Sequence, residues 1–308
     1  MSAQQGPSSP WHRGEVAIQE SIGLAGRMAE LGPRVIRDHL IEQHQAFFPL
    51  LSFAVIGSAD REGRPWATLR DGAPGFLRAP DPHHLRVEGS RVPEDPAEAG
   101  LEDGDGVALL GIELATRRRN RLNGVVERAG AGGFTIRVEQ SFGNCPKYIR
   151  VRHAVPAQGG PAQQSAAVLS QRLDAAARAF VAASDTFFVA SFVDRVGGAR
   201  QVDVSHRGGP PGFVRIGADG TLTIPDYSGN RFFNTLGNLL ANPRAGLVFP
   251  DFATGDLLQM TGRAEVVLDP AEAETSAGAE RLWRFVPERV VFRAGALRPR
   301  FIAADEAA

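Results

Sequence analysis

Short apolar runs separated by glycine, proline and aspartate dominate the chain from residue 51 onward. Runs of this kind are typical of antiparallel strands in a barrel or sandwich. In the first half they lie at residues 51–56, 65–69, 75–77, 107–114, 121–127 and 134–139. In the second half they lie at residues 186–192, 201–205, 212–216, 221–224, 245–249, 257–268, 282–285 and 289–293.

Helical patterns occupy three parts of the chain. Residues 14–45 predict two helical segments, broken at the Gly-Pro pair of residues 32–33. Residues 166–183 predict a helix that opens the second half, and residues 230–240 predict another. This last helix is expected to stop before Pro243, because proline cannot continue a helix. The fold class is therefore mainly β with peripheral helices, α+β.

Two stretches of the chain match each other without a gap. Residues 70–78 read RDGAPGFLR and residues 207–215 read RGGPPGFVR. Self-similarity at so long a period indicates a duplicated domain rather than a solenoid, so we expect two halves that face each other as a dimer would. Further matches downstream are Leu109 with Leu247, Glu113 with Asp251, Ala115 with Ala253, Thr116 with Thr254, Gly124 with Gly262, and Glu127 with Glu265.

The duplication and the composition predict the domain boundaries. Residues 1–45 form an N-terminal helical segment and residues 46–153 a first barrel-like domain. Residues 154–165 are the linker, since this stretch has too few large apolar residues to pack. Residues 166–308 form the second barrel domain.

Only the second copy carries an insert suited to anions. Residues 225–235 run from a strand end through a tight turn into a helix start, where free backbone N–H groups, Ser228 and Arg231 suit a phosphate. A capped helix with a solvated arginine is the alternative. Residues 205–207, Ser-His-Arg at a strand end, offer a second cationic clamp, with a basic hairpin corner as the alternative. The first copy has an acidic loop at residues 88–106 instead, with no matching helix.

Composition limits the classes of partner. A chain of 308 residues suits two domains, and its net charge of −1 requires neither nucleic acid nor an anionic membrane as partner. The single cysteine, Cys145, excludes an intrachain disulfide and a cysteine-based zinc site. No third ligand accompanies His12 and Glu15, so no metal site is expected. Without a membrane-length apolar run or a signal-peptide pattern, we expect a cytoplasmic protein.

Several motifs in order resemble the pyridoxamine 5'-phosphate oxidase superfamily, the FMN-binding split barrels, and more closely its bacterial flavin-nucleotide-binding branch. The resemblance implies two tandem FMN-binding split β-barrel domains that form a pseudo-dimer. The segments that carry it are residues 203–213 (DVSHRGGPPGF), 225–231 (PDYSGNR), 235–238 (TLGN) and 242–247 (NPRAGL), with 65–69 (PWATL), 116–124 (TRRRNRLNG) and 140–146 (QSFGNCP) in the first half.

The resemblance assigns site residues in the second half. In the family a turn before a helix, usually Ser-Arg-Lys, holds the flavin phosphate, and residues 228–231 stand at that place. An Arg or Lys near the end of the second strand faces the cofactor or substrate phosphate, and Arg207 matches it. A glutamine in the strand after Asn-Pro contacts the flavin ring, and Gln259 matches it. The cofactor-binding candidates of this half are therefore Ser205, His206, Arg207, Ser228, Asn230, Arg231 and Gln259.

The first half is expected to complete the site, because family members build each flavin site across a dimer interface. The run of residues 117–121 contains four arginines, which repel one another unless an anion neutralises them. Arg119 and Arg121 are the candidates, and Arg121 occupies the repeat position of Gln259. The alternative is a structural salt-bridge cluster with the carboxylates of Glu98, Glu102, Asp103 and Asp105.

The resemblance implies an FMN-dependent oxidoreductase that transfers hydride through bound flavin. Its substrate stays open, since residues 295–300 (GALRPR) replace the segment that binds pyridoxamine phosphate in the oxidases. FAD or a deazaflavin is the alternative cofactor, and NAD(P)H or a partner redox protein is the candidate co-reactant. The alternative function is a non-catalytic flavin- or haem-binding carrier or sensor, and a third is a scaffold for a redox partner. The chain is expected to be a monomeric pseudo-dimer or a homodimer.

Overall fold

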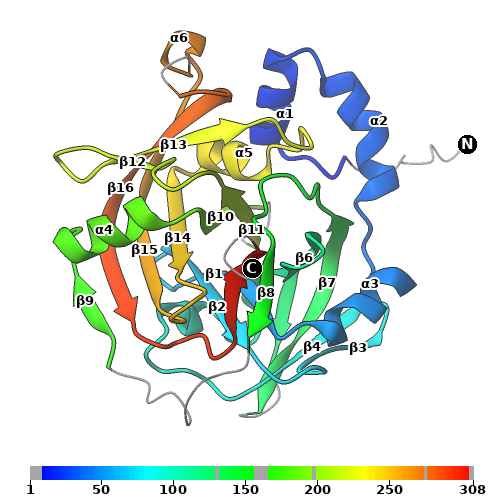
Figure 1. Ribbon diagram of the computed structural model, residues 1–308. Coiled ribbons are helices and arrows are strands. Elements are labelled where there is room, and N and C mark those ends of the chain that lie inside the picture. The colour runs from blue at the N-terminus through cyan, green and yellow to red at the C-terminus, as the bar shows by residue number, and fades with distance from the viewer. Residues whose placement is uncertain (1–8, 129–131, 156–165, 196–198, 274–275, 305–308) are drawn as a thin grey trace, which may run out of the picture.

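A computed structural model describes residues 9–128, 132–155, 166–195, 199–273 and 276–304, and consists of two antiparallel sheets with helices around them (Figure 1). The strands of the first sheet lie in the order β2-β1-β5-β6-β7-β4-β3. Their bounds are β1 Phe53–Ala59, β2 Pro65–Asp71, β3 Leu77–Asp81, β4 His84–Glu88, β5 Gly106–Glu113, β6 Arg118–Glu127 and β7 Gly133–Gly143.

The second sheet repeats this order as β11-β10-β14-β15-β16-β13-β12, with the short β9 added beside β16. Identical strand orders in the two halves confirm the expected duplicated, mainly β fold with peripheral helices. The bounds are β9 Val168–Ser170, β10 Thr186–Asp194, β11 Arg200–Gly208, β12 Arg215–Ile216, β13 Leu222–Tyr227, β14 Arg244–Pro250, β15 Leu257–Val267 and β16 Ala279–Arg293. A separate pair joins β8 (Arg152–Val155) to β17 (Arg300–Ala303).

The two halves face each other through a shared core. The strands β1 and β10 are buried on both faces, one against the core of their own half and one against the other half. Phe53, Val55 and Leu110 of the first half pack in one cluster with Phe188 and Val204 of the second. Burial of this apolar surface favours the pseudo-dimer.

Six α-helices and two 3₁₀ turns of the described residues surround the sheets. The helices α1 and α5 pack together, and a Cβ on Gly237 of α5 would lie 2.6 Å from the backbone nitrogen of Glu15. None of these helices is long and apolar enough to cross a membrane. The bounds are α1 Arg13–Ser21, α2 Ala25–Val35, α3 Glu42–Phe47, η1 Phe48–Leu50, η2 Pro96–Gly100, α4 Ala175–Ala183, α5 Asn234–Ala241 and α6 Pro270–Ala273.

Some elements differ from the prediction. The N-terminal break lies at Gly23, whose φ of 71° ends α1, and α2 continues through Pro33 into its last turn. The predicted linker lies mostly outside the described residues. The predicted pair of strands at 282–285 and 289–293 is one long strand, β16, with a register shift opposite Gly262.

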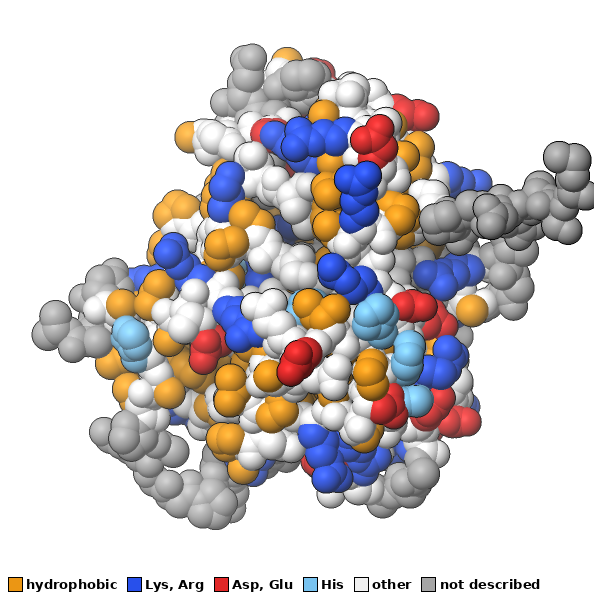
Figure 2. All heavy atoms as spheres, turned by 90° about the vertical axis from the view of Figure 1, so that its right-hand side faces the viewer, with side chains coloured by type: hydrophobic (Ala, Val, Ile, Leu, Met, Phe, Trp, Pro, Cys, Tyr) orange, Lys and Arg blue, Asp and Glu red, His pale blue; other side chains and the backbone are white. Residues whose placement is uncertain are grey.

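On the face that Figure 2 shows, basic, acidic and apolar side chains are interspersed, without one continuous basic patch.

Candidate functional site

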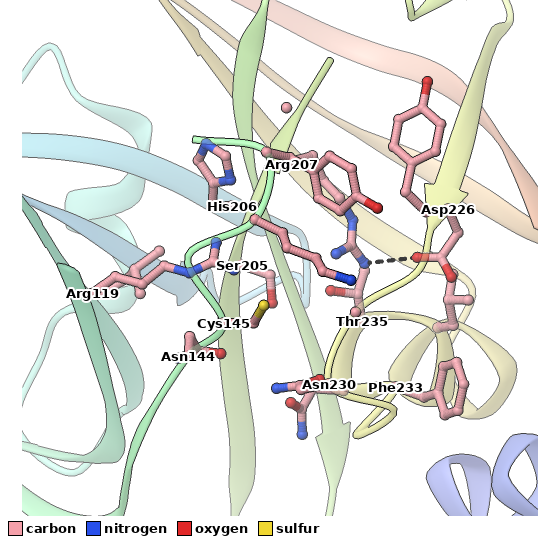
Figure 3. A pocket seen from close by; sticks show the side chains of 18 of the residues that line it. Arg119, Asn144, Cys145, Ser205, His206, Arg207, Asp226, Asn230, Phe233 and Thr235 are labelled. Atoms are coloured by element: carbon pink, nitrogen blue, oxygen red, sulfur yellow. Dashed lines mark ion pairs between the residues drawn. The ribbon is translucent and has the colours of Figure 1, made fainter. Parts of the chain in front are cut away.

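A pocket lies where the start of β6 and the chain after β7 meet the second sheet (Figure 3). It encloses about 900 Å³ of empty space, its open mouth included. The first half contributes Leu110, Arg119, Arg121, Asn144, Cys145, Lys147 and Tyr148. The second half contributes residues from the end of β11, the end of β13 and the start of α5, among them Ser205, His206, Arg207, Asp226, Asn230, Arg231 and Thr235.

The wall from the second half depends on an irregular backbone before α5. Arg231 and Phe233 have φ angles of 67° and 62°, in the left-handed region that is unfavourable for most side chains. These two residues prevent a helix from forming there, so α5 begins at Asn234 instead of at the predicted residue 230. The segment before α5 therefore stays open, and the backbone N–H groups of the first helical turn lie at the pocket.

The opposite wall comes from the first half. Figure 3 shows Arg119 entering the pocket from the side opposite to Asp226. Asn144 and Cys145 follow β7 and line the space between these walls. Tyr148 stacks on Tyr227 with ring centroids 5.2 Å apart, and its hydroxyl donates to the Ser228 carbonyl at 3.1 Å.

The cations of the pocket are unequally neutralised. Arg207 Nη2 lies 3.4 Å from Asp226 Oδ1, and Arg121 Nη2 lies 3.0 Å from Asp203 Oδ1. Arg119 makes no ion pair with any carboxylate of the described residues, and its Nε is buried without a hydrogen-bond partner.

Arg231 is neutralised more fully, because its guanidinium donates to both carboxylate oxygens of Glu280. This bidentate ion pair competes with any ligand for the Arg231 cation.

Burial shifts the ionisation of several pocket groups. Desolvation, aided by the neighbouring Arg207 and Arg121 cations and opposed by Cys145, lowers the pKa of Arg119 to about 10. Burial lowers the pKa of His206 well below its usual value, with Arg119 and Arg207 acting in the same direction. Burial also raises the pKa of the Asp226 carboxyl. The histidine is therefore neutral near pH 7, and arginines supply the positive charge.

The structure brings most of the predicted site residues together. Ser228 lies beside the pocket, with its hydroxyl 3.4 Å from Arg231 Nη2. Sequence reasoning missed Asp226, Tyr148 and Tyr227 as wall residues. Tyr148 and Tyr227 are the only tyrosines of the chain. The predicted residues that line the pocket are Arg119, Arg121, Ser205, His206, Arg207, Asn230 and Arg231.

Gln259 does not reach this pocket. Its side chain is fully buried against residues of the first half. Its Nε2 donates there to the Ala67 carbonyl at 3.0 Å and to Asp95 Oδ1 at 3.0 Å. The reason is the pseudo-two-fold arrangement, which places the repeat equivalents Gln259 and Arg121 at two different sites.

The acidic residues of the first half do not neutralise the arginine run either. Glu98 pairs with Arg70, and Glu102 pairs with Arg91. Asp105 Oδ2 accepts from the Glu102 backbone N–H instead. The alternative of a local salt-bridge cluster around residues 117–121 was therefore wrong for these carboxylates.

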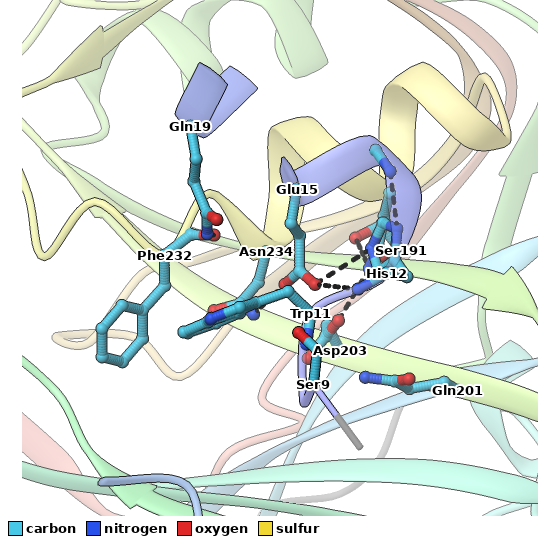
Figure 4. A network of polar contacts seen from close by, with 12 residues as sticks. Ser9, Trp11, His12, Glu15, Gln19, Ser191, Gln201, Asp203, Phe232 and Asn234 are labelled. Carbon is cyan, nitrogen blue, oxygen red and sulfur yellow. Dashed lines mark hydrogen bonds and ion pairs between the residues drawn. The ribbon is translucent and has the colours of Figure 1, made fainter. Parts of the chain in front are cut away.

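A buried polar network lies behind the pocket and connects the N-terminal segment to it (Figure 4). The His12 side chain lies 2.8 Å from Asn238 Oδ1, and Asn238 donates to Asp203 at 2.8 Å. Asn234, a pocket residue, donates to Glu15 Oε1 at 2.5 Å. Burial, followed by the nearby Asp203 charge, raises the pKa of Glu15 to about 8.

Sequence reasoning considered His12 and Glu15 only as metal ligands. Among the residues that the structure describes, no group of three or more His, Cys, Asp or Glu side chains is arranged to hold a metal ion. The capping box that His12 and Glu15 form at the start of α1 is the sequence signal that could have identified their structural role.

Comparison with known protein families finds a match in the second half. Residues 173–298 match the model of the pyridoxamine 5'-phosphate oxidase family, which confirms the resemblance found in the sequence. No curated protein sequence matches the chain.

Similar solved structures each cover about two fifths of the chain. An FAD-binding protein from Mesorhizobium loti is 16% identical and covers 42% of this chain and 97% of its own, with a TM-score of 0.29. A protein related to general stress protein 26, from Clostridium acetobutylicum, is 17% identical and covers 43% and 95%, with a TM-score of 0.27. HutZ, the heme storage protein from Vibrio cholerae, is 18% identical and covers 40% and 96%, with a TM-score of 0.28.

Proposed function

Because residues 173–298 of this chain match the model of the pyridoxamine 5'-phosphate oxidase family, we propose that the pocket binds FMN and that the protein is a flavin-dependent oxidoreductase. One observation supports this most strongly. Six buried nitrogen atoms of pocket-lining residues make no hydrogen bond, namely Nε of Arg119, Nε and Nη2 of Arg121, Nε of Arg207, Nδ2 of Asn144 and Nε2 of His206. Unpaired buried polar groups cost free energy, so their gathering favours a ligand with several polar atoms.

The residues fit a flavin phosphate and a flavin ring. The first turn of α5, Asn230 and Arg231 provide the N–H groups and the cation that a phosphate requires. Arg119 and Arg207 would balance the remaining negative charge from two opposite walls. Bound flavin supplies hydride transfer, and the chain's own residues anchor it, orient it and limit the access of water.

Binding and turnover are tested by one titration series. The purified protein is titrated with FMN and followed by absorbance and by quenching of flavin fluorescence, and then reduced anaerobically with NADPH or NADH. We expect FMN to bind saturably and its absorption bands to bleach on reduction. Addition of an electron acceptor should then reoxidise the flavin.

Two variants locate the binding site. Arg207→Met should weaken FMN binding more than tenfold, because it removes a charge-assisted contact of about 1.5–3 kcal/mol. Arg263→Met is the control, since this arginine of the same half is 65% exposed and pairs with Glu288. Absence of FMN binding to the wild type, or equal binding by the two variants, would contradict the proposal.

A non-catalytic haem-binding protein is the second candidate, and His206 favours it. A neutral imidazole with a buried, unpartnered Nε2 is the form of histidine that ligates iron. Titration with haemin, followed by the Soret band in wild type and in His206→Ala, distinguishes this candidate. Flavin that binds but is never reduced would instead support a flavin carrier.

A further inference from the structure

The pocket has a counterpart in the other half of the pseudo-dimer. At the pocket, Arg121 Nη1 of β6 donates to the Val204 carbonyl of β11 at 3.1 Å. At the counterpart, Gln259 Nε2 of β15 donates to the Ala67 carbonyl of β2 at 3.0 Å. Since β6 and β15, and likewise β2 and β11, hold the same places in the two sheets, the two positions are equivalent.

The counterpart place is filled by the chain itself. The carboxylate of Asp95, only 5% exposed, accepts from the Thr68 hydroxyl and from Gln259 Nε2. Its cationic partner is Arg293, whose Nη1 lies 2.8 Å from Asp95 Oδ2. Each residue that donates to the Asp95 carboxylate has a repeat equivalent in the open pocket, and that equivalent also carries a hydrogen-bond donor.

A second carboxylate neutralises the arginine that corresponds to Arg207. Glu98, 7% exposed, forms an ion pair with Arg70, the repeat equivalent of Arg207. The turn that carries Glu98 lies close against β1, since a Cβ on Gly100 would lie 2.4 Å from the Ala59 carbonyl oxygen. The buried cation of the first half thus has a permanent partner.

The register of the strands extends the correspondence to all four donors. Arg121 pairs with Phe142, and Gln259 pairs with Val291, so the residues two positions further, Asn144 and Arg293, are also equivalent. In the open pocket, Asn144 Nδ2 and Arg207 Nε lack partners. The equivalent positions are Thr68 and Ser205, Gln259 and Arg121, Arg293 and Asn144, and Arg70 and Arg207.

The connection between equivalent strands decides which site is open. Between β13 and β14 the chain forms the segment before α5 and α5 itself, which leave the pocket accessible. Between β4 and β5 it forms η2, preceded by Asp95 as N-cap and containing Glu98. Two acidic residues of this loop, Asp95 and Glu98, are therefore explained by the cations beneath them.

We propose that residues 95–100 seal the second of two equivalent anion sites, with Asp95 and Glu98 as built-in substitutes for the acidic groups of a ligand. The sealed site becomes a site for small carboxylates or other oxyanions when Glu98 is removed. With the second site sealed, the wild-type chain binds one ligand and not two. This statement rests on the proposed function, whereas the sealed site itself does not.

Chemical rescue tests the sealed site without any flavin. Glu98→Ala leaves Arg70 buried and unpaired, so its unfolding temperature should fall by roughly 5–10 °C. Potassium formate should restore at least half of this loss in a saturable way, because formate replaces the deleted carboxylate. Potassium gluconate at equal ionic strength, whose anion is too large to enter, should not.

Glu102→Ala is the matched control, because Glu102 lies on the same connection and pairs with the exposed Arg91. Neither this variant nor the wild type should respond to formate beyond gluconate. If Glu98→Ala does not fold in gluconate, refolding in formate decides: recovery supports the sealed site, and no recovery overturns it. An equal effect of the two salts on folded Glu98→Ala overturns it as well. Two FMN equivalents per wild-type chain would overturn the one-ligand statement alone.

Discussion

Arg119 should be a residue whose removal stabilises the ligand-free protein and weakens the ligand complex. Burial lowers its pKa to about 10, well below the usual value of an arginine, which means that the folded protein disfavours its charge. One pKa unit corresponds to about 1.36 kcal/mol, and partial exposure reduces the full difference, so the cost is about 2 kcal/mol. Arg119→Met keeps the apolar stem and removes this cost. The unfolding temperature without ligand should rise by roughly 3–6 °C.

The same substitution should reduce FMN affinity by about ten- to a hundredfold, the value of one charge-assisted hydrogen bond. Thermal unfolding of flavin-free protein and titration with FMN measure the two effects on one preparation. Arg117→Met is the control, since Arg117 lies exposed at the preceding turn. A lower unfolding temperature for Arg119→Met, or an FMN affinity equal to that of the control, would refute the view that Arg119 is held for an anion.

Three further predictions concern packing, protonation and the phosphate turn. Gly237→Ala should destabilise the protein to urea by about 2 kcal/mol or more because its Cβ would collide with Glu15, whereas Gly26→Ala, with open space around it in α2, should be neutral or stabilising. The unfolding free energy of the wild type should fall as the pH rises from 5 to 8, because folded Glu15, with its pKa raised to about 8, retains a proton that the unfolded chain releases. Glu15 contributes at most about 1.36 kcal/mol per pH unit to this fall. Glu15→Gln should remove this pH dependence. Glu280→Gln should tighten FMN binding by about three- to tenfold by releasing Arg231, whereas Arg231→Ala should weaken it more than tenfold.

Each of these has an outcome that contradicts it. Equal stabilities of Gly237→Ala and Gly26→Ala would show that α1 yields to the added methyl group. A pH profile of Glu15→Gln that matches the wild type would assign the slope to another group. Unchanged FMN affinity in both phosphate-turn variants, with lower stability, would make the Arg231 ion pair purely structural and move the phosphate elsewhere.

Local pattern predicted most of the secondary structure, and it failed where tertiary contacts or backbone angles override it. Strands such as β5 and β15 were located within one or two residues, because alternating or continuous apolar runs are local signals. The start of α5 was missed because left-handed angles at Arg231 and Phe233 leave no mark in the hydrophobic pattern. The break predicted at Pro33 was wrong, because the chain breaks instead at Gly23, whose φ of 71° ends α1, and α2 continues through Pro33 to Val35.

The sequence by itself determined the duplication, the fold class and the segments of the second half that line the pocket, since all three depend on linear motifs. Only the tertiary structure decided which of two equivalent sites is open. That choice depends on carboxylates meeting cations from distant parts of the chain, as when Asp95 meets Arg293. Two repeat positions with the same backbone can thus bind different groups, because the fold and not the repeat decides which side chains become their partners.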